Sequence, residues 1–443
     1  MENVFKTATK VVQRNVDQNV QEVETEICVV GAGIAGVSAA IEAARLGRSV
    51  TLIDGLPTLG GQAVNSIIGI FCGLFSNNKE PYQFTRGFAD DILDELGAKG
   101  ALNYRYGVNN VVMYDEIALS RCIENAVRES GVKVILGAIL RDVHKEDRRI
   151  SSIELATRFG DVRVKANSFI DATGDAAVAW QAGLPCQETA EGSVYGTQML
   201  VLENVDLDHI PDRYEVADRL KEKAGEYGLI REDGFAFAFP GRGVALVNMT
   251  HVETPLEPIA NSKNALDGKA QADKVFEYLK TEYPDCFKNA TIRSYGQLGI
   301  RQTRWIVGKH HLTIDEVRNG TKFEDAIART AWPLELHDRK EGYVWEPYGE
   351  DHVHYVPLGS LTPPDVNNLL AVGRCIDGDL AALSSVRVMG PCIAMGMAAA
   401  HALDLAGTGS VHDINIETLQ ERLQDNLTGK DTSRNGKNVK VGN

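Results

Sequence analysis

Three glycines near the N-terminus have the spacing of a nucleotide-binding loop. Gly31, Gly33 and Gly36 follow the apolar segment 26–30 and stand where a helix is expected to begin. Glycine at these places permits a tight turn, lets the backbone approach a pyrophosphate and lets the helix lie close to a sheet. The helix N-terminus would offer N–H groups and a positive dipole end to the phosphates.

An acidic residue completes this pattern. Asp54 follows the next apolar segment, residues 49–53, and lies 23 positions after Gly31. A carboxylate at this place accepts hydrogen bonds from ribose hydroxyls. Because residues 26–30, 37–46 and 49–53 are expected to form a strand, a helix and a strand, the motif has the βαβ context that it requires. The pattern therefore predicts a bound dinucleotide.

Three side chains later in the chain are candidates for acid–base chemistry. His337, His354 and Tyr355 precede an expected late strand at residues 368–373. An imidazole titrates near neutral pH and therefore suits a general base. For each of them the alternative is a structural hydrogen bond.

Arginines, cysteines and the remaining histidines are less specific. Arg301 and Arg387 could hold an anionic group or a cofactor, and a salt bridge at a domain junction is the alternative. Seven cysteines are scattered without a C-x-x-C pair, which argues against a zinc ribbon or a redox dithiol. His310 and His311 are adjacent, and neighbouring side chains on a strand point apart. We therefore expect no metal site, and we expect Cys72 to pack in the core, with thiol chemistry as the alternative.

The chain that must position these residues has 443 residues, enough for more than one domain. Its 44 % hydrophobic and 24 % charged residues exclude a mainly disordered chain. The net charge of −15 repels phosphate backbones and argues against nucleic-acid binding. No apolar run of about 18 residues is present, and the N-terminus has no apolar signal-peptide core. We expect a cytoplasmic protein that binds neither nucleic acid nor membranes.

The other expected elements follow from local patterns. Continuous apolar runs predict buried strands, and apolar residues at helical spacing predict helices. Thr313 and Glu316 have the spacing of a capping box, which opens a helix. Strands are expected at residues 132–136, 148–156, 162–168, 168–171, 198–202, 235–239 and 244–249, and helices at residues 119–129, 265–282 and 391–405.

Three motifs in order resemble glutathione-reductase-like flavoproteins. The loop after Asp54 carries the pair Gly60-Gly61, which in that group folds over the pyrophosphate. Residues 171–175 resemble its central Ala-Thr-Gly turn, and residues 369–379 resemble the strand that leads to the ribityl group of the flavin. The resemblance implies that the dinucleotide is FAD rather than NAD.

Further segments resemble the bacterial FAD-dependent oxidoreductase family, whose members have a single dinucleotide-binding domain. The similarity runs from about residue 24 to 407 and includes residues 299–304, 336–338 and 385–389. The chain has Leu358-Gly359 where relatives often have Tyr-Arg, and Leu380 where they often have His. These departures predict a less anionic substrate than that of a typical relative.

The resemblance implies an α/β fold: a glutathione-reductase-like FAD-binding domain with a Rossmann-type parallel sheet, and an inserted mixed α+β substrate domain. The expected parts are an N-terminal arm (1–23), a first part of the FAD-binding domain (24–195), a first part of the substrate domain (196–290), a return segment (291–310), a second substrate or cap region (311–365), a second part of the FAD-binding domain (366–425) and a disordered tail (426–443). The arm is a candidate for packing on another subunit.

The resemblance also implies site residues. His337, His354, Tyr355 and Arg387 would lie on the substrate side of the flavin. The helix from residue 391 would point its N-terminus at the flavin ring, and covalent flavin attachment through Cys72 is an open alternative. The residues expected to contact FAD are Gly31, Gly33, Ile34, Ala35, Gly36, Asp54, Gly60, Gly61, Gln62, Leu140, Ala172, Thr173, Gly174, Gly373, Asp379, Val388, Met389 and Gly390.

The implied function is an FAD-dependent oxidoreductase, either a dehydrogenase or an oxidase. It would oxidise a small organic substrate by hydride transfer to flavin N5, and O₂ or another acceptor would reoxidise the flavin. The sequence has no second G-x-G-x-x-G after a strand and no C-x-x-C, so the electrons are expected to come from the substrate. Two alternatives stay open: a reductase fed by an external electron donor and an RNA-modifying flavoprotein.

Overall fold

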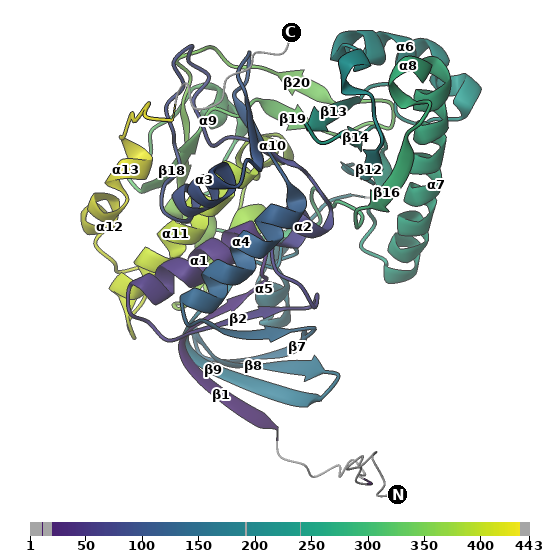
Figure 1. Cartoon of the computed structure of the whole chain (residues 1–443). Helices are drawn as coiled ribbons and strands as arrows, with labels where there is room; N and C mark the ends of the chain where they lie inside the picture. Colours follow the sequence, from purple (N-terminus) through teal and green to yellow (C-terminus); the bar gives the residue numbers. More distant parts are fainter. Residues whose placement is uncertain (1–10, 12–19, 191–192, 240, 435–443) are drawn as a thin grey trace, which may run out of the picture.

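A seven-stranded sheet forms the centre of the computed structural model, which describes residue 11 and residues 20–190, 193–239 and 241–434 (Figure 1). Five strands run parallel, in the order β6-β2-β1-β9-β22. Side chains of β1 alternate between two buried clusters, with Val29 in one and Val30 in the other, as expected for a strand covered on both faces. The parallel strands are β1 (Gln21–Val30), β2 (Val50–Asp54), β6 (Lys133–Leu136), β9 (Gly160–Asp171) and β22 (Leu369–Ala371).

Strand β9 is one continuous strand, where the sequence predicted two. Its first half pairs antiparallel with β8 (Arg149–Thr157), and its last residues pair parallel with β22 on the same edge. A single long strand can therefore serve two partners in succession. β7 (Ile139–Glu146) pairs with β8 and extends the sheet. Of the predicted N-terminal arm, residues 1–10 and 12–19 lie outside the described residues, and residues 21–23 belong to β1.

Helices cover both faces of this sheet. α1 (Ile34–Arg45) and α11 (Met389–Ala406) share one buried cluster with α3 (Phe88–Ala98) and α4 (Glu116–Glu129), and α5 (Ala177–Gln181) belongs to the cluster of the other face (Figure 1). α1 and α11 approach closely, since a Cβ on Gly396 would lie 2.2 Å from the carbonyl oxygen of Ala35. The predicted helices 119–129 and 391–405 are therefore confirmed, each with an earlier start.

The chain forms a second buried core between strands β9 and β22 in the sequence. In space this core lies beside the main sheet (Figure 1, upper right). A four-stranded antiparallel sheet, in the order β13-β14-β12-β16, packs one face against helices α6, α7 and α8. The predicted strands and helix of this region are confirmed. Their bounds are β12 (Leu200–Glu203), α6 (Arg213–Tyr227), β13 (Phe235–Phe239), β14 (Val244–Asn248), α7 (Pro258–Glu282), α8 (Pro284–Phe287) and β16 (Thr291–Tyr295).

Short elements connect the two cores. The capping box predicted at Thr313 is confirmed: its hydroxyl accepts from the N–H of Glu316, whose carboxylate in turn accepts from the N–H of Thr313. The remaining helices are α2 (Gly61–Asn65), α9 (Ile314–Arg318), α10 (Leu380–Val386), α12 (Ile416–Arg422) and α13 (Gln424–Leu427). The remaining strands are β3 (Ile70–Phe71), β4 (Leu102–Arg105), β5 (Val111–Tyr114), β10 (Cys186–Glu188), β11 (Tyr195–Gly196), β15 (Val252–Glu253), β17 (Arg304–Ile306), β18 (Ala326–Thr330), β19 (Leu334–Leu336), β20 (Val344–Glu346) and β21 (His354–Pro357).

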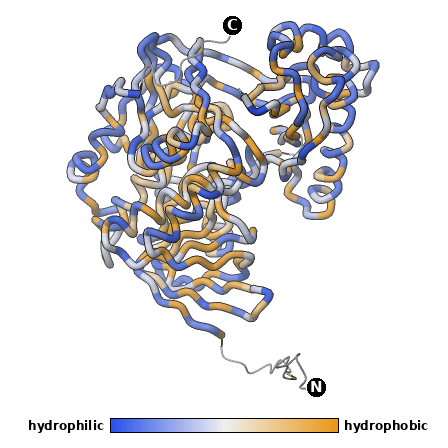
Figure 2. Tube along the Cα trace, viewed as in Figure 1, coloured by the Kyte–Doolittle hydropathy of each residue, from blue (hydrophilic) through white to orange (hydrophobic). Residues whose placement is uncertain are grey.

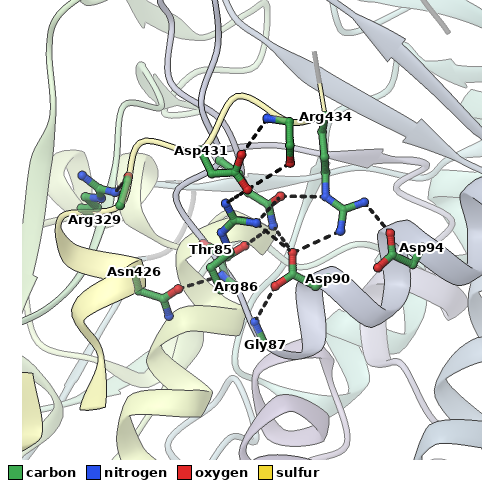
Figure 3. A network of polar contacts seen from close by, with 12 residues as sticks. Thr85, Arg86, Gly87, Asp90, Asp94, Arg329, Asn426, Asp431 and Arg434 are labelled. Atoms are coloured by element: carbon green, nitrogen blue, oxygen red, sulfur yellow. Dashed lines mark hydrogen bonds and ion pairs between the residues drawn. The ribbon is translucent and has the colours of Figure 1, made fainter. Parts of the chain in front are cut away.

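Of the expected disordered tail (426–443), the structure describes residues 426–434, and segment 424–434 makes polar contacts with α3 and the loop before it (Figure 3); residues 435–443 lie outside the described residues. Arg434 donates to Asp94 at 2.7 Å and to Asp90 at 3.2 Å, both on α3. Asp431 accepts from Arg86 at 2.6 Å. Arg434 therefore has partners of opposite charge on α3, and Asp431 has one on the loop before it.

Apolar residues concentrate along the central strands and the helices packed on them (Figure 2). α11 has a length and hydropathy sufficient to cross a membrane, but 78 % of that segment is buried inside the protein. It is the core helix between α1 and β18.

Candidate active site

Two predicted glycine-containing turns pack directly on each other. Gly31 has a φ of +104°, and a Cβ there would lie 2.3 Å from the carbonyl oxygen of Ala172. A Cβ on Gly36 would lie 1.9 Å from the carbonyl oxygen of Gly31. No larger side chain fits at either position. The loop 31–36 and the turn 172–174 therefore form one backbone surface at the carboxyl ends of β1 and β9.

Gly33 differs from its neighbours because it borders open space. Nothing lies within 4 Å of a Cβ built at Gly33, which is the N-cap of α1 and has no side chain that caps the helix. The pair Gly60-Gly61 folds back on it: the Gly60 N–H donates to the carbonyl of Ala32 at 2.8 Å, and a Cβ on Gly61 would lie 2.7 Å from the Cα of Gly33. The result is an uncapped helix N-terminus bordered by glycine backbone, which suits a pyrophosphate.

Asp54 lies beside this loop, as predicted. Its Oδ2 accepts from the N–H of Ala32 at 2.6 Å, and its Oδ1 accepts from the N–H of Leu56 at 2.7 Å. Burial raises the pKa of Asp54, while these two hydrogen bonds lower it. Each carboxylate oxygen can accept a second hydrogen bond, so the geometry leaves room for ribose hydroxyls.

An incompletely paired guanidinium lies close to the same helix. The Nη1 of Arg374 is buried without a hydrogen-bond partner among the described residues, and its Nη2 lies 3.8 Å from the Asp175 carboxylate. A Cβ on Gly174 would lie 2.3 Å from Nη2, and a Cβ on the adjacent Gly373 would lie 3.4 Å from the Cβ of Ala35 in α1. A buried cation without full pairing is costly. This position therefore favours a negatively charged ligand near the N-terminus of α1.

A chain of titratable side chains links two distant segments. Nε2 of His337 lies 3.1 Å from Oε1 of Glu335, and its Nδ1 lies 2.8 Å from Nε2 of His251. Nδ1 of His251 lies 2.8 Å from the carbonyl oxygen of Lys340. Burial and neighbouring arginines lower the pKa of both imidazoles, that of His251 to about 2. The Tyr343 ring stacks on His337 at a centroid distance of 4.7 Å.

Two arginines flank this chain, and their hydrogen-bond partners are neutral. Arg301 donates to the carbonyl of Tyr195 at 2.6 Å, and Arg387 donates to the carbonyl of Arg301 and to Oε1 of Gln302. Burial lowers the pKa of Arg301 to about 9 and that of Arg387 to about 10. Both residues nevertheless remain partly accessible, and together with Glu335, whose charge acts on both, they define a candidate substrate recess. The site is therefore more cationic than the sequence departures at residues 358–359 and 380 suggested.

This recess extends toward the start of α11. Burial raises the pKa of the Cys72 thiol, and the charge of Glu335 raises it further, so the two side chains are within electrostatic reach. The carbonyl of Cys72 accepts from the N–H of Gly390 at 2.9 Å. A Cβ on Gly73 would lie 2.8 Å from Cγ2 of Val388. Segment 72–73 therefore contacts the helix N-terminus that was expected to face a cofactor ring.

The structure does not bring the three predicted acid–base residues together. His354 is fully buried, with Nε2 at 3.0 Å from Oγ of Ser385 and Nδ1 at 3.1 Å from His352. Tyr355 is opposite Arg329 in the β18–β21 pair. Neighbouring side chains on a strand point to opposite faces, so His354 and Tyr355 cannot line the same site. Of the three, only His337 joins the chain with Glu335.

The adjacent histidines 310 and 311 have separate partners. His310 lies 3.1 Å from Glu316, and His311 lies 2.8 Å from Asp377. Within the described residues, no group of three or more His, Cys, Asp or Glu side chains is arranged to hold a metal ion.

Comparison with known families identifies the cofactor. The sequence profile of the family described as FAD dependent oxidoreductase matches residues 26–423. The chain belongs to this family. It is therefore an enzyme, an FAD-dependent oxidoreductase, and FAD is its cofactor.

Solved structures resemble this oxidoreductase at low identity, and a search of curated protein sequences finds no match. A geranylgeranyl bacteriochlorophyll reductase-like protein from Thermoplasma acidophilum has a TM-score of 0.49 and 16 % identity, covering 91 % of this chain and 85 % of its own. The flavin-dependent brominase Bmp2 has a TM-score of 0.47 and 13 % identity, covering 91 % and 83 %. The aromatic hydroxylase CabE has a TM-score of 0.45 and 12 % identity, covering 91 % and 68 %. These identities are too low to indicate a shared reaction.

The glycine-bordered helix N-terminus fits the pyrophosphate of FAD. Most residues predicted to contact FAD surround this place. They are Gly31, Gly33, Ile34, Ala35, Gly36, Asp54, Gly60, Gly61, Ala172, Gly174 and Gly373.

The other predicted FAD contacts have structural partners of their own. Asp379 caps α10, and its two oxygens accept from the N–H groups of Ala382 and Ile314. Gly390 already donates its N–H to Cys72. Gln62 donates to the carbonyl of Ile300, and Thr173 donates to Asp171. Leu140 of β7 pairs with Leu155 of β8. Val388 is the N-cap of α11, and Met389 is its first residue.

Sequence reasoning missed two members of the titratable chain. Glu335 precedes His337 by two positions, and this spacing places both side chains on one face of an extended segment, so the signal was present. His251 lies 86 residues before His337, and no local pattern connects the two.

Proposed function

We propose that this flavoenzyme oxidises a small organic molecule by hydride transfer to FAD, and that its dinucleotide-binding domain is of the glutathione-reductase-like type. The observation that carries the proposal is the group formed by Glu335, Arg301 and Arg387. It combines a carboxylate able to exchange protons with two arginines whose printed hydrogen-bond partners, among the described residues, are neutral, and it lies near segment 72–73.

The residues of this recess have distinct tasks in the proposed reaction. FAD, when bound, accepts the hydride from the substrate carbon. Loss of that hydride is easier when a base takes the neighbouring O–H or N–H proton, and the Glu335–His337 pair supplies this base. Arg301 and Arg387 orient a negatively charged or strongly polar group of the substrate. His354 and Tyr355, which lie elsewhere, have no task in it.

Anaerobic bleaching of the flavin tests this function. The purified protein, loaded with FAD, is mixed with amino acids, hydroxy acids, amines and alcohols in the absence of oxygen. We expect at least one molecule to reduce the flavin, and air or an artificial acceptor to restore its colour. Bleaching by a reduced electron-donor protein alone, with no response to any metabolite, would contradict the proposal and favour the externally fed reductase.

A further inference from the structure

The hydrogen bonds along the Glu335–His337–His251 chain can be assigned donor by donor. The Lys340 carbonyl only accepts, so Nδ1 of His251 carries the proton of that contact. If His251 is neutral, its Nε2 then has a lone pair and accepts from Nδ1–H of His337. In a neutral His337, Nε2 would then carry no proton. Its lone pair would face an oxygen of the Glu335 carboxylate, also an acceptor, at 3.1 Å.

Two acceptors cannot form this contact without another proton. Either Glu335 is a carboxylic acid that donates to His337, or one imidazole of the chain is protonated and His337 donates to the carboxylate. In each case the three residues together hold one proton more than a carboxylate with two neutral imidazoles. This pattern of contacts therefore requires one proton shared between Glu335 and His337.

Only one end of the chain reaches the recess. The side chain of Glu335 is 28 % exposed, whereas that of His337 is 1 % exposed and has both nitrogens engaged. His251 is also buried. Oε2 of Glu335 accepts from the indole N–H of Trp332 at 3.1 Å, and this bond holds the carboxylate in place. A substrate in the recess can therefore touch Glu335 but neither imidazole.

We propose that Glu335 is the catalytic residue that exchanges a proton with the substrate, and that His337 and His251 are positioning residues that store the proton behind it. The inference rests on the oxidation proposed above. In the oxidation, the stored proton lies on His337 and the Glu335 carboxylate takes the substrate O–H or N–H proton. The two electrons and the hydrogen of the neighbouring C–H bond leave as hydride to FAD, so that a C=O or C=N bond forms.

Neighbouring arginines attract the Glu335 carboxylate but disfavour a proton on His337, so the hydrogen bond to that carboxylate must hold the proton there. Three arginines act on the chain: Arg231 and Arg301 disfavour a charged His337 and His251, and Arg387 also disfavours a charged His337. The negative charge of Glu335, in turn, favours the charged forms of Arg301 and Arg387. The other titratable groups that face the pair are Cys72, Tyr343 and Asp233.

Spectroscopy on the FAD-loaded protein tests the stored proton without a substrate. We expect either a protonated Nε2 on His337, seen by ¹⁵N NMR of labelled histidines, or a carboxylic-acid C=O band that disappears in Glu335→Gln, seen by infrared difference spectroscopy. Glu316→Gln is the matched control, because Glu316 also lies 3.1 Å from a histidine, His310, outside the recess. It should change neither signal. An unprotonated Nε2 together with no such band would overturn the proposal.

Kinetics on a substrate found by the metabolite screen test the catalytic role. Glu335→Gln should keep FAD and slow flavin reduction by a factor on the order of 10²–10⁴, Glu335→Asp should restore part of the rate, and Glu316→Gln should leave it unchanged. His251→Asn should instead shift the pH profile of reduction with a smaller loss of rate. An unchanged rate in Glu335→Gln would overturn the proposal. Absence of any reducing metabolite would reject the oxidation itself, while the spectroscopic result on the stored proton would stand.

Discussion

Neighbouring glycines at the FAD site differ in what a side chain would meet. A Cβ on Gly36 would collide with the backbone of Gly31 at 1.9 Å, whereas a Cβ on Gly33 would meet nothing within 4 Å. Gly36 is therefore required by the fold itself. Gly33 is required only by a ligand that approaches the backbone there, so substitutions at the two positions should separate folding from cofactor binding.

We expect Gly33→Val to leave the apoprotein folded and to weaken FAD binding by about a hundredfold or more, which corresponds to roughly 3 kcal/mol. The valine would occupy the space that the pyrophosphate needs. Gly36→Ala should lower the melting temperature of the apoprotein as well, because its Cβ has no room. Calorimetry of both apoproteins and titration with FAD measure the two effects. Equal FAD affinity in Gly33→Val and wild type would show that the pyrophosphate binds elsewhere.

At the scale of elements, the C-terminal segment 424–434 acts as a strap across α3 and the loop before it (Figure 3). Asp90 is its central acceptor, receiving hydrogen bonds from Arg434 at 3.2 Å and from the N–H of Gly87 at 3.1 Å. The guanidinium of Arg329 donates to the carbonyl of Gly429. Charge complementarity rather than apolar burial holds this segment, which explains why its composition suggested disorder.

Removal of Arg434 should loosen the strap and little else. Arg434→Ala loses contacts to Asp90, Asp94 and Gln83, and partly exposed ion pairs contribute about 1 kcal/mol or less each. We expect faster hydrogen exchange in residues 424–434 and unchanged FAD binding. Arg318→Ala, which removes a surface ion pair with Glu346, is the control. Exchange that is equally fast in wild type and Arg434→Ala would show that Arg434 does not hold the strap.

The strap should also respond to acid. A backbone hydrogen bond from Ser433 and the Arg86 guanidinium lower the pKa of Asp431 to about 2. Because the folded-state pKa is depressed, the contribution of this carboxylate is complete above the ordinary aspartate pKa, about 4, and is lost as the pH falls toward 2. NMR titration of Asp431 measures this shift. A midpoint near 4 would mean that the carboxylate is unpaired in solution.

At the scale of the whole molecule, the parallel sheet and the antiparallel sheet beyond it have separate buried cores. The glycines predicted to contact FAD come from the first, while the titratable chain draws His251 from the edge of the second and Glu335 from the segment that returns toward the first. The sequence contains one G-x-G-x-x-G after a strand, so no second dinucleotide site is expected.

NADH and NADPH should therefore reduce the bound flavin poorly. Stopped-flow mixing under anaerobic conditions, at micromolar nucleotide, measures the rate, and the reducing metabolite serves as the positive control. Rapid bleaching by either nucleotide would favour the reductase alternative. Retention of tRNA in a gel shift at moderate salt would instead favour the RNA-modifying alternative, against the expectation from the net charge of −15.

The sequence alone determined the parts of this protein that depend on short-range order. The Gly31–Gly36 loop, Asp54, the capping box at Thr313 and the buried strands each follow from residue types a few positions apart, because turns, caps and strand burial are local requirements. The βαβ unit followed from them, whereas FAD and its family followed from the resemblance of several further segments to known flavoproteins. The single continuous β9 was missed, because its length depends on two partner strands from other parts of the chain.

Only the tertiary structure decided which titratable residues meet. His337, His354 and Tyr355 appeared equivalent in the sequence, yet the alternation of side chains along β21 separates His354 from Tyr355, and only His337 hydrogen-bonds to Glu335 among the described residues. His251 joins the chain across 86 residues, and the Arg374 guanidinium lies against Gly174, 200 residues earlier in the chain. Such contacts arise from the packing of distant segments, and packing is a property of the whole fold that no local pattern records.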